Sequence, residues 1–381
     1  MTFVGLTWDH PRGYDALAET ARRVNEGRTQ PLIHWNKQPL EGFESAPIAE
    51  LAAGNDLLVM DHPHIGEAVA EDCFLPLEEL YPPELLRSWQ RDSVGPSSAS
   101  YHWDGRTWAL PLDVATQVMA RRVDRIAAAP RDWHELVELA GRQPVALSLA
   151  GPHAVLNLMS IVAGAGGRVG DDDFLSETEA IAALDIMHRL YACRPSGSER
   201  LNPIALLEAM VQGKDIALVP LVFGYVTYAS LRYGKSAIGF SDTIRCADGK
   251  GGVIGGTGIA FTRRCRPTPE LLEHIASLLS MRTQVDVFPA FGGQPSARAA
   301  WQDAEVNHLW GDFYRNTLET AETALLRPRF DGYIAFQTAA AKYVRTALER
   351  REKAETTLVF LRSLWRQARH GARGHIEQIR G

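Results

Sequence analysis

The sequence predicts an α/β protein with two domains. The chain has 381 residues, which is long for one hydrophobic core and sufficient for two. In its N-terminal part, strand-like and helix-like segments alternate, a rhythm that indicates a parallel sheet with helices on its faces. After about residue 268 the pattern becomes mostly helical. These three observations set the fold class.

The N-terminal elements follow from apolar spacing. Apolar runs over residues 3–8, 31–35 and 56–60 are typical of strands, and each is followed by a turn signal or a helix. Leu17, Ala21 and Val24 recur at helical spacing, so residues 14–24 are expected to form a helix. Shorter helices are expected over residues 48–53 and in the stretch that ends at Val69.

The pattern changes near residue 108, where a long apolar, β-branched run predicts a buried strand over residues 108–120. A helix is expected after Asp132, a residue type that caps helix N-termini. Further strands are predicted over residues 145–149 and 215–223, and residues 251–261 begin the last mixed section. Further helices are predicted over residues 153–162, 181–191, 203–212, 269–281, 306–324 and 334–369, with a flexible tail over 371–381.

Composition excludes several classes of protein. The net charge of -6 argues against a general nucleic-acid binder, which needs a basic face. No apolar run is long enough to span a membrane. Four separated cysteines form no zinc pattern, and one disulfide remains open. A strand begins close to Met1 without a signal peptide, so a cytoplasmic location is expected, or a periplasmic or extracellular one if a signal was trimmed.

Several segments in one order resemble a known family. They are the stretch Leu110–Arg122, the helix Arg131–Ala140, the unit Leu207–Leu218, the strand Gly255–Ala260, and the Gly/Pro segments 292–296 and 327–333. These resemble, respectively, the crossing strand and the "x-T-W-D-E-L", "F-x-x-G-K-A-A-M", "G-G-x-x-x-A-I", "G-x-x-P-x" and "R-P-x-x-x-x-Y" segments of the carbohydrate-type extracellular solute-binding proteins of ABC transporters.

The resemblance implies a two-lobe periplasmic-binding-protein-like fold with hinge crossings and a helical C-terminal section. It implies one lobe from residues 1–110 and about 255–310, and a second from residues 111–254 and about 311–370. In this family the lobes close over a ligand held in the cleft that separates them. The family is normally exported, which this sequence does not indicate.

Two strands end in the same tripeptide, Asp-His-Pro. The first loop contains Trp8, Asp9, His10 and Arg12. As a ligand site, Trp8 offers a flat ring, Asp9 accepts hydroxyl hydrogen bonds, and Arg12 pairs with a carboxylate. As a structural feature, the loop is an ordinary helix start with Pro in the first turn. Its place at the carboxyl end of a strand favours ligand binding.

The second loop, Asp61-His62-Pro63-His64, has three interpretations. The residues could ligate zinc, perform acid–base chemistry, or contact a ligand through hydrogen bonds. Polar ligand contact is favoured, and no metal or cofactor is expected. The two loops together could form one polar site.

Further candidates lie in the later segments. Asp113 is surrounded by apolar residues, so it binds a ligand or cation or forms a structural salt bridge, and Gln117 is a weaker candidate on the same strand. His153 opens a helix, and Tyr225 and Tyr228 follow a strand with Phe223. Gly256 and Thr257 allow a close backbone approach.

The function expected first is capture of a small polar ligand, a sugar or a carboxylated metabolite, by a solute-binding protein related to ABC transporters. A permease is the implied partner, and no nucleic acid is expected. The alternatives are a cytoplasmic enzyme on the same scaffold, with Asp9, His10, Asp61 and His62 as acid and base, and a regulatory ligand sensor.

Overall fold

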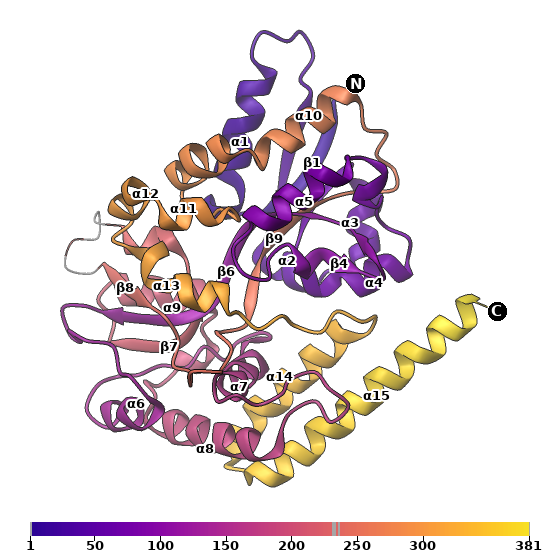
Figure 1. The fold of residues 1–381 in the computed structure, drawn as a ribbon. Coiled ribbons are helices and arrows are strands. Elements are labelled where there is room, and N and C mark those ends of the chain that lie inside the picture. Colours follow the sequence, from indigo (N-terminus) through magenta and orange to yellow (C-terminus); the bar gives the residue numbers. More distant parts are fainter. Residues whose placement is uncertain (1, 231–233, 235–236, 381) are drawn as a thin grey trace. The chain divides into compact units, whose positions relative to one another are not determined.

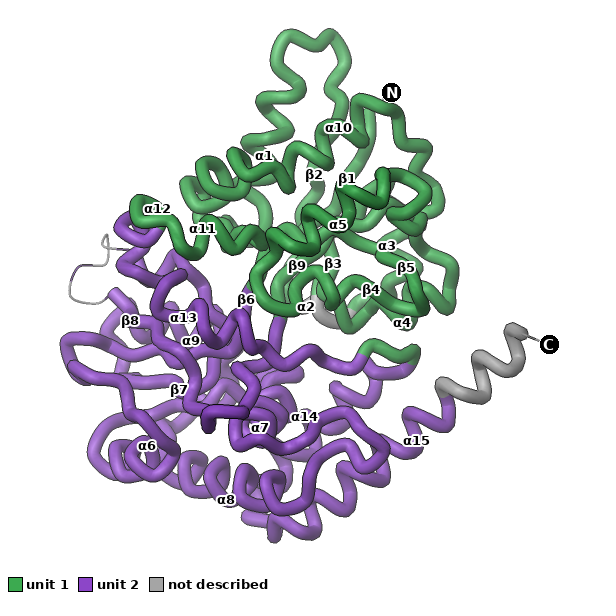
Figure 2. The backbone as a smooth tube through the Cα atoms, in the orientation of Figure 1, with its two compact units in different colours: residues 1–114, 255–306, 329–331 green, residues 115–254, 307–328, 332–381 purple. Residues whose placement is uncertain are grey.

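The computed structural model describes residues 2–230, 234 and 237–380, without the side chains of residues 41, 44, 45 and 372–380. It divides into two compact units, shown in two colours in Figure 2. Unit 1 comprises residues up to Val114, Gly255–Val306 and Arg329–Asp331; unit 2 comprises Ala115–Ile254, Asn307–Pro328 and the chain from Gly332 onward. Strands β6 and β9 each carry the chain from one unit into the other.

Unit 1 opens with alternating strands and helices (Figure 1). Its strands are β1 (Phe3–Trp8), β2 (Ile33–Gln38), β3 (Leu57–Met60), β4 (His102–Trp103), β5 (Arg106–Thr107) and most of β9 (Ile254–Phe261). Its helices are α1 (Pro11–Asn25), α2 (Leu40–Ser45), α3 (Ile48–Gly54), α4 (Ile65–Ala70), α5 (Pro83–Asp92), α10 (Pro269–Leu278) and α11 (Arg298–Gln302), with short turns η1 (His62–His64) and η3 (Ala99–Tyr101).

Unit 2 is richer in helix. Its strands are most of β6 (Leu110–Arg122), β7 (Leu218–Phe223) and β8 (Ile238–Ser241). Its helices are α6 (Trp133–Ala140), α7 (His153–Gly164), α8 (Glu177–Cys193), α9 (Pro203–Val211), η5 (Val226–Ala229), α13 (Phe313–Glu322), α14 (Tyr333–Arg350) and α15 (Ala354–Arg380); α12 (Ala304–Leu309) begins in unit 1 and ends in unit 2.

The sheet of unit 1 has both faces covered by helices. Strands β2, β1 and β3 are parallel, as predicted, and β9 joins β3 in antiparallel direction. Leu57 and Val59 pack in a cluster that includes α1 and α10, while Leu58 and Met60 pack in a second cluster that includes α3 and α4. Because successive side chains of a strand point to opposite faces, a four-residue strand serves both clusters, which explains its unbroken apolar sequence.

Unit 2 combines antiparallel strands with a group of packed helices. Strand β6 pairs antiparallel with both β7 and β8. Helix α7 contacts α8 and α14, and α15 contacts α14 and α8. All residues of α7 are buried, so this helix forms the centre of the group. No helix among the described residues is both long and apolar enough to cross a membrane.

The predicted α/β fold class is confirmed, but three predicted elements are wrong. Residues 145–149 form only an isolated bridge, from Val145 to Leu218. The helix expected over 306–324 is broken into α12 and α13, because Gly311 and Asp312 adopt left-handed backbone conformations. The helix expected over 334–369 is broken at Arg351, also left-handed. Gly311 is a residue type that marks helix ends, whereas Arg351 is not a glycine and gives no such signal.

The flexible tail over residues 371–381 stays a prediction. The backbone of α15 continues to Arg380, but the side chains of residues 372–380 and all of residue 381 lie outside the described part of the chain.

A buried ion pair holds three segments of unit 1 together. Nε of Arg12, in the first turn of α1, donates to Oδ1 and Oδ2 of Asp113 at 3.2 and 2.9 Å, and Nη2 also pairs with Oδ1. The backbone N–H of Gln294 donates to the other side of the same carboxylate at 3.1 Å. Both charged side chains are only 3% exposed. The pair therefore joins α1, β6 and the segment around Gln294.

A second buried polar network lies in unit 2. Gln117 of β6 donates to Asn157 at 2.7 Å and accepts from the Ser160 hydroxyl at 2.6 Å. Ser160 in turn accepts from the backbone N–H of Val253, and Asn157 donates to the carbonyl of Ser148. Since the side-chain amides of Gln117 and Asn157 and the hydroxyl of Ser160 each have a partner, burial of these three groups is not costly, and they join α7 to β6.

Helix α1 is capped by a histidine. The Nδ1 atom of His10 accepts from the backbone N–H of Arg12 at 3.1 Å, and Pro11 occupies the first helical turn. Burial, reinforced by the positive charge of Arg12 and opposed by Asp9, lowers the pKa of His10 to about 4. The neutral imidazole required for the cap is thus the form that the folded protein favours.

The first prediction concerns the buried ion pair. Replacement of Arg12 by Met or of Asp113 by Asn should each lower the free energy of unfolding by about 3–5 kcal/mol, because each leaves a buried partner uncompensated. The double variant should lose clearly less than the sum of the single losses. Urea unfolding of the four proteins measures this coupling, and additive losses would contradict it.

The second prediction concerns pH. The folded-state pKa of His10 lies below its value of about 6.5 in the unfolded chain, so its stabilising contribution is complete above pH 6.5 and is lost as pH falls toward 4. His10→Asn keeps a capping acceptor but does not titrate. Between pH 7 and pH 4.5 it should therefore lose up to about 3 kcal/mol less stability than the wild type.

The matched control is His134→Asn, since the His134 side chain is 77% exposed. Guanidinium unfolding at the two pH values should give the same pH dependence for this control as for the wild type. An equally steep dependence in His10→Asn would overturn the assignment.

Candidate functional site

The strongest candidate site in unit 1 lies at the carboxyl ends of its parallel strands. Strands β2, β1 and β3 run in the same direction, so the residues that follow Gln38, Trp8 and Met60 emerge at one edge of the sheet. In open α/β sheets, ligands bind outside this edge. The two Asp-His-Pro loops both begin here, on the neighbouring strands β1 and β3.

Trp8 is held in place by contacts on its ring. The ring stacks with His10 at a centroid distance of 5.3 Å and with Phe43 at 5.7 Å, and the guanidinium of Arg12 lies 5.3 Å from its centroid. Gly13 lies so close to the indole that a Cβ atom there would come within 1.7 Å of Nε1. With only 3% of its surface exposed, Trp8 supports the loop more than it offers an open face.

Asp9 is the most accessible charged group of the first loop. Its side chain is 58% exposed and accepts from Nζ of Lys37 at 2.7 Å. The Asp9 carboxylate raises the pKa of Lys37, which also lies 4.7 Å from the ring centroid of Tyr14. Beside them, Nε2 of Gln38 is buried without a hydrogen-bond partner among the residues whose side chains are described. The exposed ion pair suits a polyhydroxylated ligand, because Lys37 donates and Asp9 accepts hydrogen bonds.

The second loop is more closed. Oδ1 of Asp61 accepts from the backbone N–H of His62 at 2.9 Å and lies 3.1 Å from its Nδ1 atom. The His62 ring is 1% exposed and packs edge-on against Tyr101, whose hydroxyl donates to the carbonyl of Met60. The Asp61 side chain is 18% exposed, so it is the more accessible acceptor of this loop.

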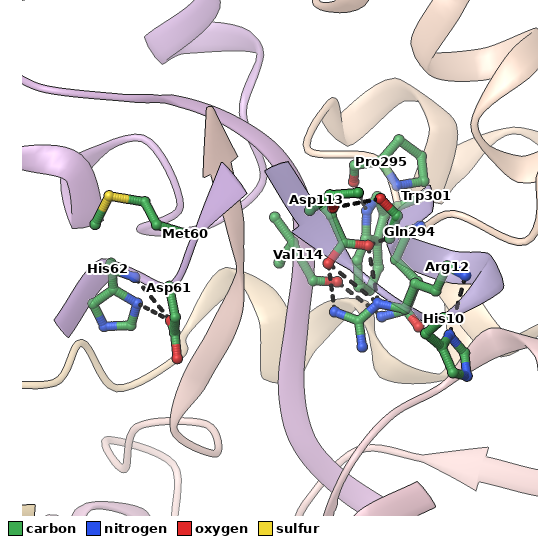
Figure 3. Close-up of polar contacts among 12 residues, drawn as sticks. His10, Arg12, Met60, Asp61, His62, Asp113, Val114, Gln294, Pro295 and Trp301 are labelled. Atoms are coloured by element: carbon green, nitrogen blue, oxygen red, sulfur yellow. Dashed lines mark hydrogen bonds and ion pairs between the residues drawn. The ribbon is translucent and has the colours of Figure 1, made fainter. Parts of the chain in front are cut away.

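Figure 3 shows the two Asp-His groups as separate clusters. Asp61 and His62 are joined to each other, while His10 contacts Arg12, and Arg12 contacts Asp113. Neither histidine is aimed at the other in this view. A single polar site shared by both loops therefore stays a prediction that depends on a ligand to connect them.

Arg12 and Asp113 have the structural role that sequence analysis left open for Asp113. Their charges are satisfied by each other and by the backbone N–H of Gln294.

Gly256 lies directly against the backbone of Asp113. A Cβ atom at Gly256 would lie 2.2 Å from the carbonyl oxygen of Asp113, and the φ of +98° at Gly256 also favours glycine. Thr257 is buried. The space beside Gly256, where sequence analysis expected a ligand, is thus occupied by the backbone of β6.

The aromatic candidates of unit 2 form a compact group of their own. Tyr225 and Tyr228 pack edge-to-face with centroids 6.5 Å apart, and both are buried. His153, at the start of α7, packs against Phe223 at 5.7 Å. Phe223 is only partly buried. These residues are therefore packed side chains whose part in ligand binding stays a prediction.

Lys37 and Gln38 were missed by sequence analysis, although they lie beside the first loop. The register pairs Thr7 with Lys37 and Trp8 with Gln38. A signal existed, since a parallel strand expected next to β1 brings its own last residues to the same edge. Sequence analysis predicts that this strand ends at residue 35, but β2 continues to Gln38. The prediction stops too early because the last residues of β2 are polar.

The described side chains include no group of three or more His, Cys, Asp or Glu residues that could hold a metal ion. His64 lies 3.9 Å from Glu67 and lowers the pKa of that carboxyl, but these two residues form only a pair.

Comparison with known proteins identifies the fold. No family model and no curated protein matches the sequence. A ribitol-bound ABC transporter solute-binding protein from Agrobacterium radiobacter matches with a TM-score of 0.79 at 18% identity, covering 96% of this chain and 98% of that one. Maltose-bound MalE3 of T. maritima matches with a TM-score of 0.76 at 18% identity and the same coverage.

A third structure, a solute-binding protein from Agrobacterium vitis with bound D-mannitol, has a TM-score of 0.76 at 15% identity and covers 97% of this chain and 99% of that one. The alignments extend over nearly the whole length of both proteins, so they include both units. The chain therefore has the fold of the carbohydrate-type solute-binding proteins of ABC transporters, as the sequence motifs predicted.

Proposed function

We propose that this protein is a solute-binding protein that captures a small polyhydroxylated ligand, a sugar or a sugar alcohol. The observation that carries the proposal is the full-length likeness of fold to proteins that bind ribitol, maltose and mannitol. The edge of the unit 1 sheet supports it, because hydroxyl groups need both donors and acceptors, and Lys37 and Asp9 supply them.

In unit 1 the main proposed contacts are the accessible acids Asp9 and Asp61, which would accept hydroxyl hydrogen bonds. His10 would border the ligand, and the buried Trp8 would support the loop from behind. From unit 2, Tyr225 would contribute its ring or hydroxyl. Arg12 and Asp113 are not included, because a ligand would have to break their buried pair.

We propose further that the two units are the two lobes of the family and that the partner is an ABC transporter permease. This rests on the division of the chain into units and on the ABC transporter membership of the similar proteins. An enzyme is not favoured, because the similar proteins are binding proteins and His62 is almost wholly buried.

The third prediction tests ligand capture. Ribitol, D-mannitol, maltose and maltotriose should be titrated calorimetrically, and at least one should bind with one-to-one stoichiometry. At a ligand concentration 100 times Kd, the protein should be stabilised by about 2.7 kcal/mol, visible as a rise in Tm. If none of a broader panel of sugars and polyols binds, the proposal fails.

The fourth prediction assigns the contacts. With the ligand found in that panel, Asp9→Ala and Asp61→Ala should each raise Kd about tenfold, since each removes a charged hydrogen-bond acceptor. Asp72→Ala is the matched control, because Asp72 is also an exposed acid of unit 1 paired with a basic residue, Arg263. An unchanged Kd in both single variants would contradict the proposed site.

A further inference from the structure

Unit 2 contains a cavity of about 1390 Å³ that does not include any residue of the candidate ligand site. It lies where α8 and α14 pass beside the loop at Gly151 and the turn that joins α14 to α15. Its size exceeds that of most ligand pockets, which measure about 300–1,000 Å³. The cavity is open to solvent and lined mainly by polar side chains.

Two helices turn a polar face toward this cavity. The residues of α14 that line it are Lys342, Arg345, Thr346, Leu348 and Glu349. The residues of α8 that line it are Asp185, His188, Arg189, Tyr191 and Ala192. Most of these positions are three or four residues apart and lie on one helix face. Because many of the charged side chains are exposed, they carry little desolvation cost and a ligand from solvent can reach them.

The cavity is positively charged although the chain is not. Seven basic side chains line it, against four acidic ones, which leaves a formal excess of three positive charges with histidine neutral. The whole chain carries a net charge of -6. Concentration of positive charge in a concave region attracts anions and raises their local concentration.

Two of the guanidinium groups are held in fixed orientations. Nη1 of Arg345 donates to the backbone carbonyls of Leu149 and Gly151. Arg194 lies 3.6 Å from the ring centroid of Tyr191, donates to its carbonyl and pairs with Glu199 at 3.1 Å. Arg345 uses one nitrogen for these bonds, which leaves Nε and Nη2 available for a planar anion such as a carboxylate or phosphate.

Four other cations of the cavity have no carboxylate partner among the described residues. They are Arg189, Lys342, Arg351 and Lys353. One of the acidic groups is already occupied, because Glu352 accepts from the hydroxyls of Tyr343 and Thr357. These neutral hydroxyls leave the charge of Glu352 in place, but Glu199 is paired with Arg194 and Arg200, whereas the four cations have no carboxylate partner among the described residues.

We propose that this cavity is a second binding site, specific for small anions with two or more carboxylate or phosphate groups. Several separated cations favour a multiply charged ligand over a single charge, since each additional ionic contact adds to the binding energy. The site is independent of sugar or polyol capture, because it uses residues of unit 2 that are not among the proposed ligand contacts.

The test uses citrate and pyrophosphate as probes in isothermal titration calorimetry of the full chain at low ionic strength. At least one of them should bind, and binding should weaken as salt is added. Binding of citrate alone indicates a carboxylate site, and binding of pyrophosphate alone indicates a phosphate site; either supports the proposal. Absence of binding by both probes overturns it.

Variants locate the binding. Lys342→Gln and Arg189→Gln should each weaken binding of the active probe about tenfold, by loss of one charged contact. Neither side chain has an ion-pair or hydrogen-bond partner within the described part of the chain, so the fold should be preserved, whereas Arg345→Gln would remove the bonds to Leu149 and Gly151. Lys214→Gln, at an exposed lysine of unit 2 outside the cavity, should bind like the wild type. Equal affinities in the Lys342, Arg189 and Lys214 variants would overturn the site.

Discussion

The Arg12 guanidinium and the Asp113 carboxylate meet where α1, β6 and the Gln294 segment come together, and both are shielded from water. This contact fixes the first turn of α1, and with it the cap at His10 and the ring of Trp8. The edge of the sheet from which the candidate ligand contacts emerge is therefore organised by one charge pair. Burial of such a pair has a desolvation cost, but burial of either charge without the other would cost more. The folded protein therefore keeps the two side chains in contact.

Much of the fold could be predicted because the responsible signals are local. Apolar runs indicate β1, β3, β6 and β7, and the family resemblance indicates β9. Asp132 caps α6 as predicted, where it accepts from the backbone N–H of Glu135. The break at Arg351 could not be predicted, because an arginine adopts the left-handed conformation there, whereas Gly311 did offer a signal for the break between α12 and α13. Residues 145–149 have the composition of a strand, but only Val145 forms a β-bridge, with Leu218.

The candidate site was only partly accessible to sequence reasoning. Asp9 and Asp61 were found because a strand followed by Asp-His-Pro is visible in the sequence. The choice between ligand binding and an internal ion pair for Asp113 depended on which side chain lies opposite, and Arg12 is about a hundred residues away. Gly256 is likewise distant in sequence from Asp113, and its role is to let the Asp113 backbone approach closely. Contacts across such distances follow from topology, not from local pattern.

Helix α7 has no residue that faces solvent, from His153 to Gly164. Its backbone amides can exchange with deuterium only when the surrounding helices separate, so they report the global opening of unit 2. The same burial leaves no position in α7 where a dye or a spin label could be attached without loss of packing. Helix α15 offers such a position at Val359, which is exposed, whereas Phe360 stacks on Tyr343.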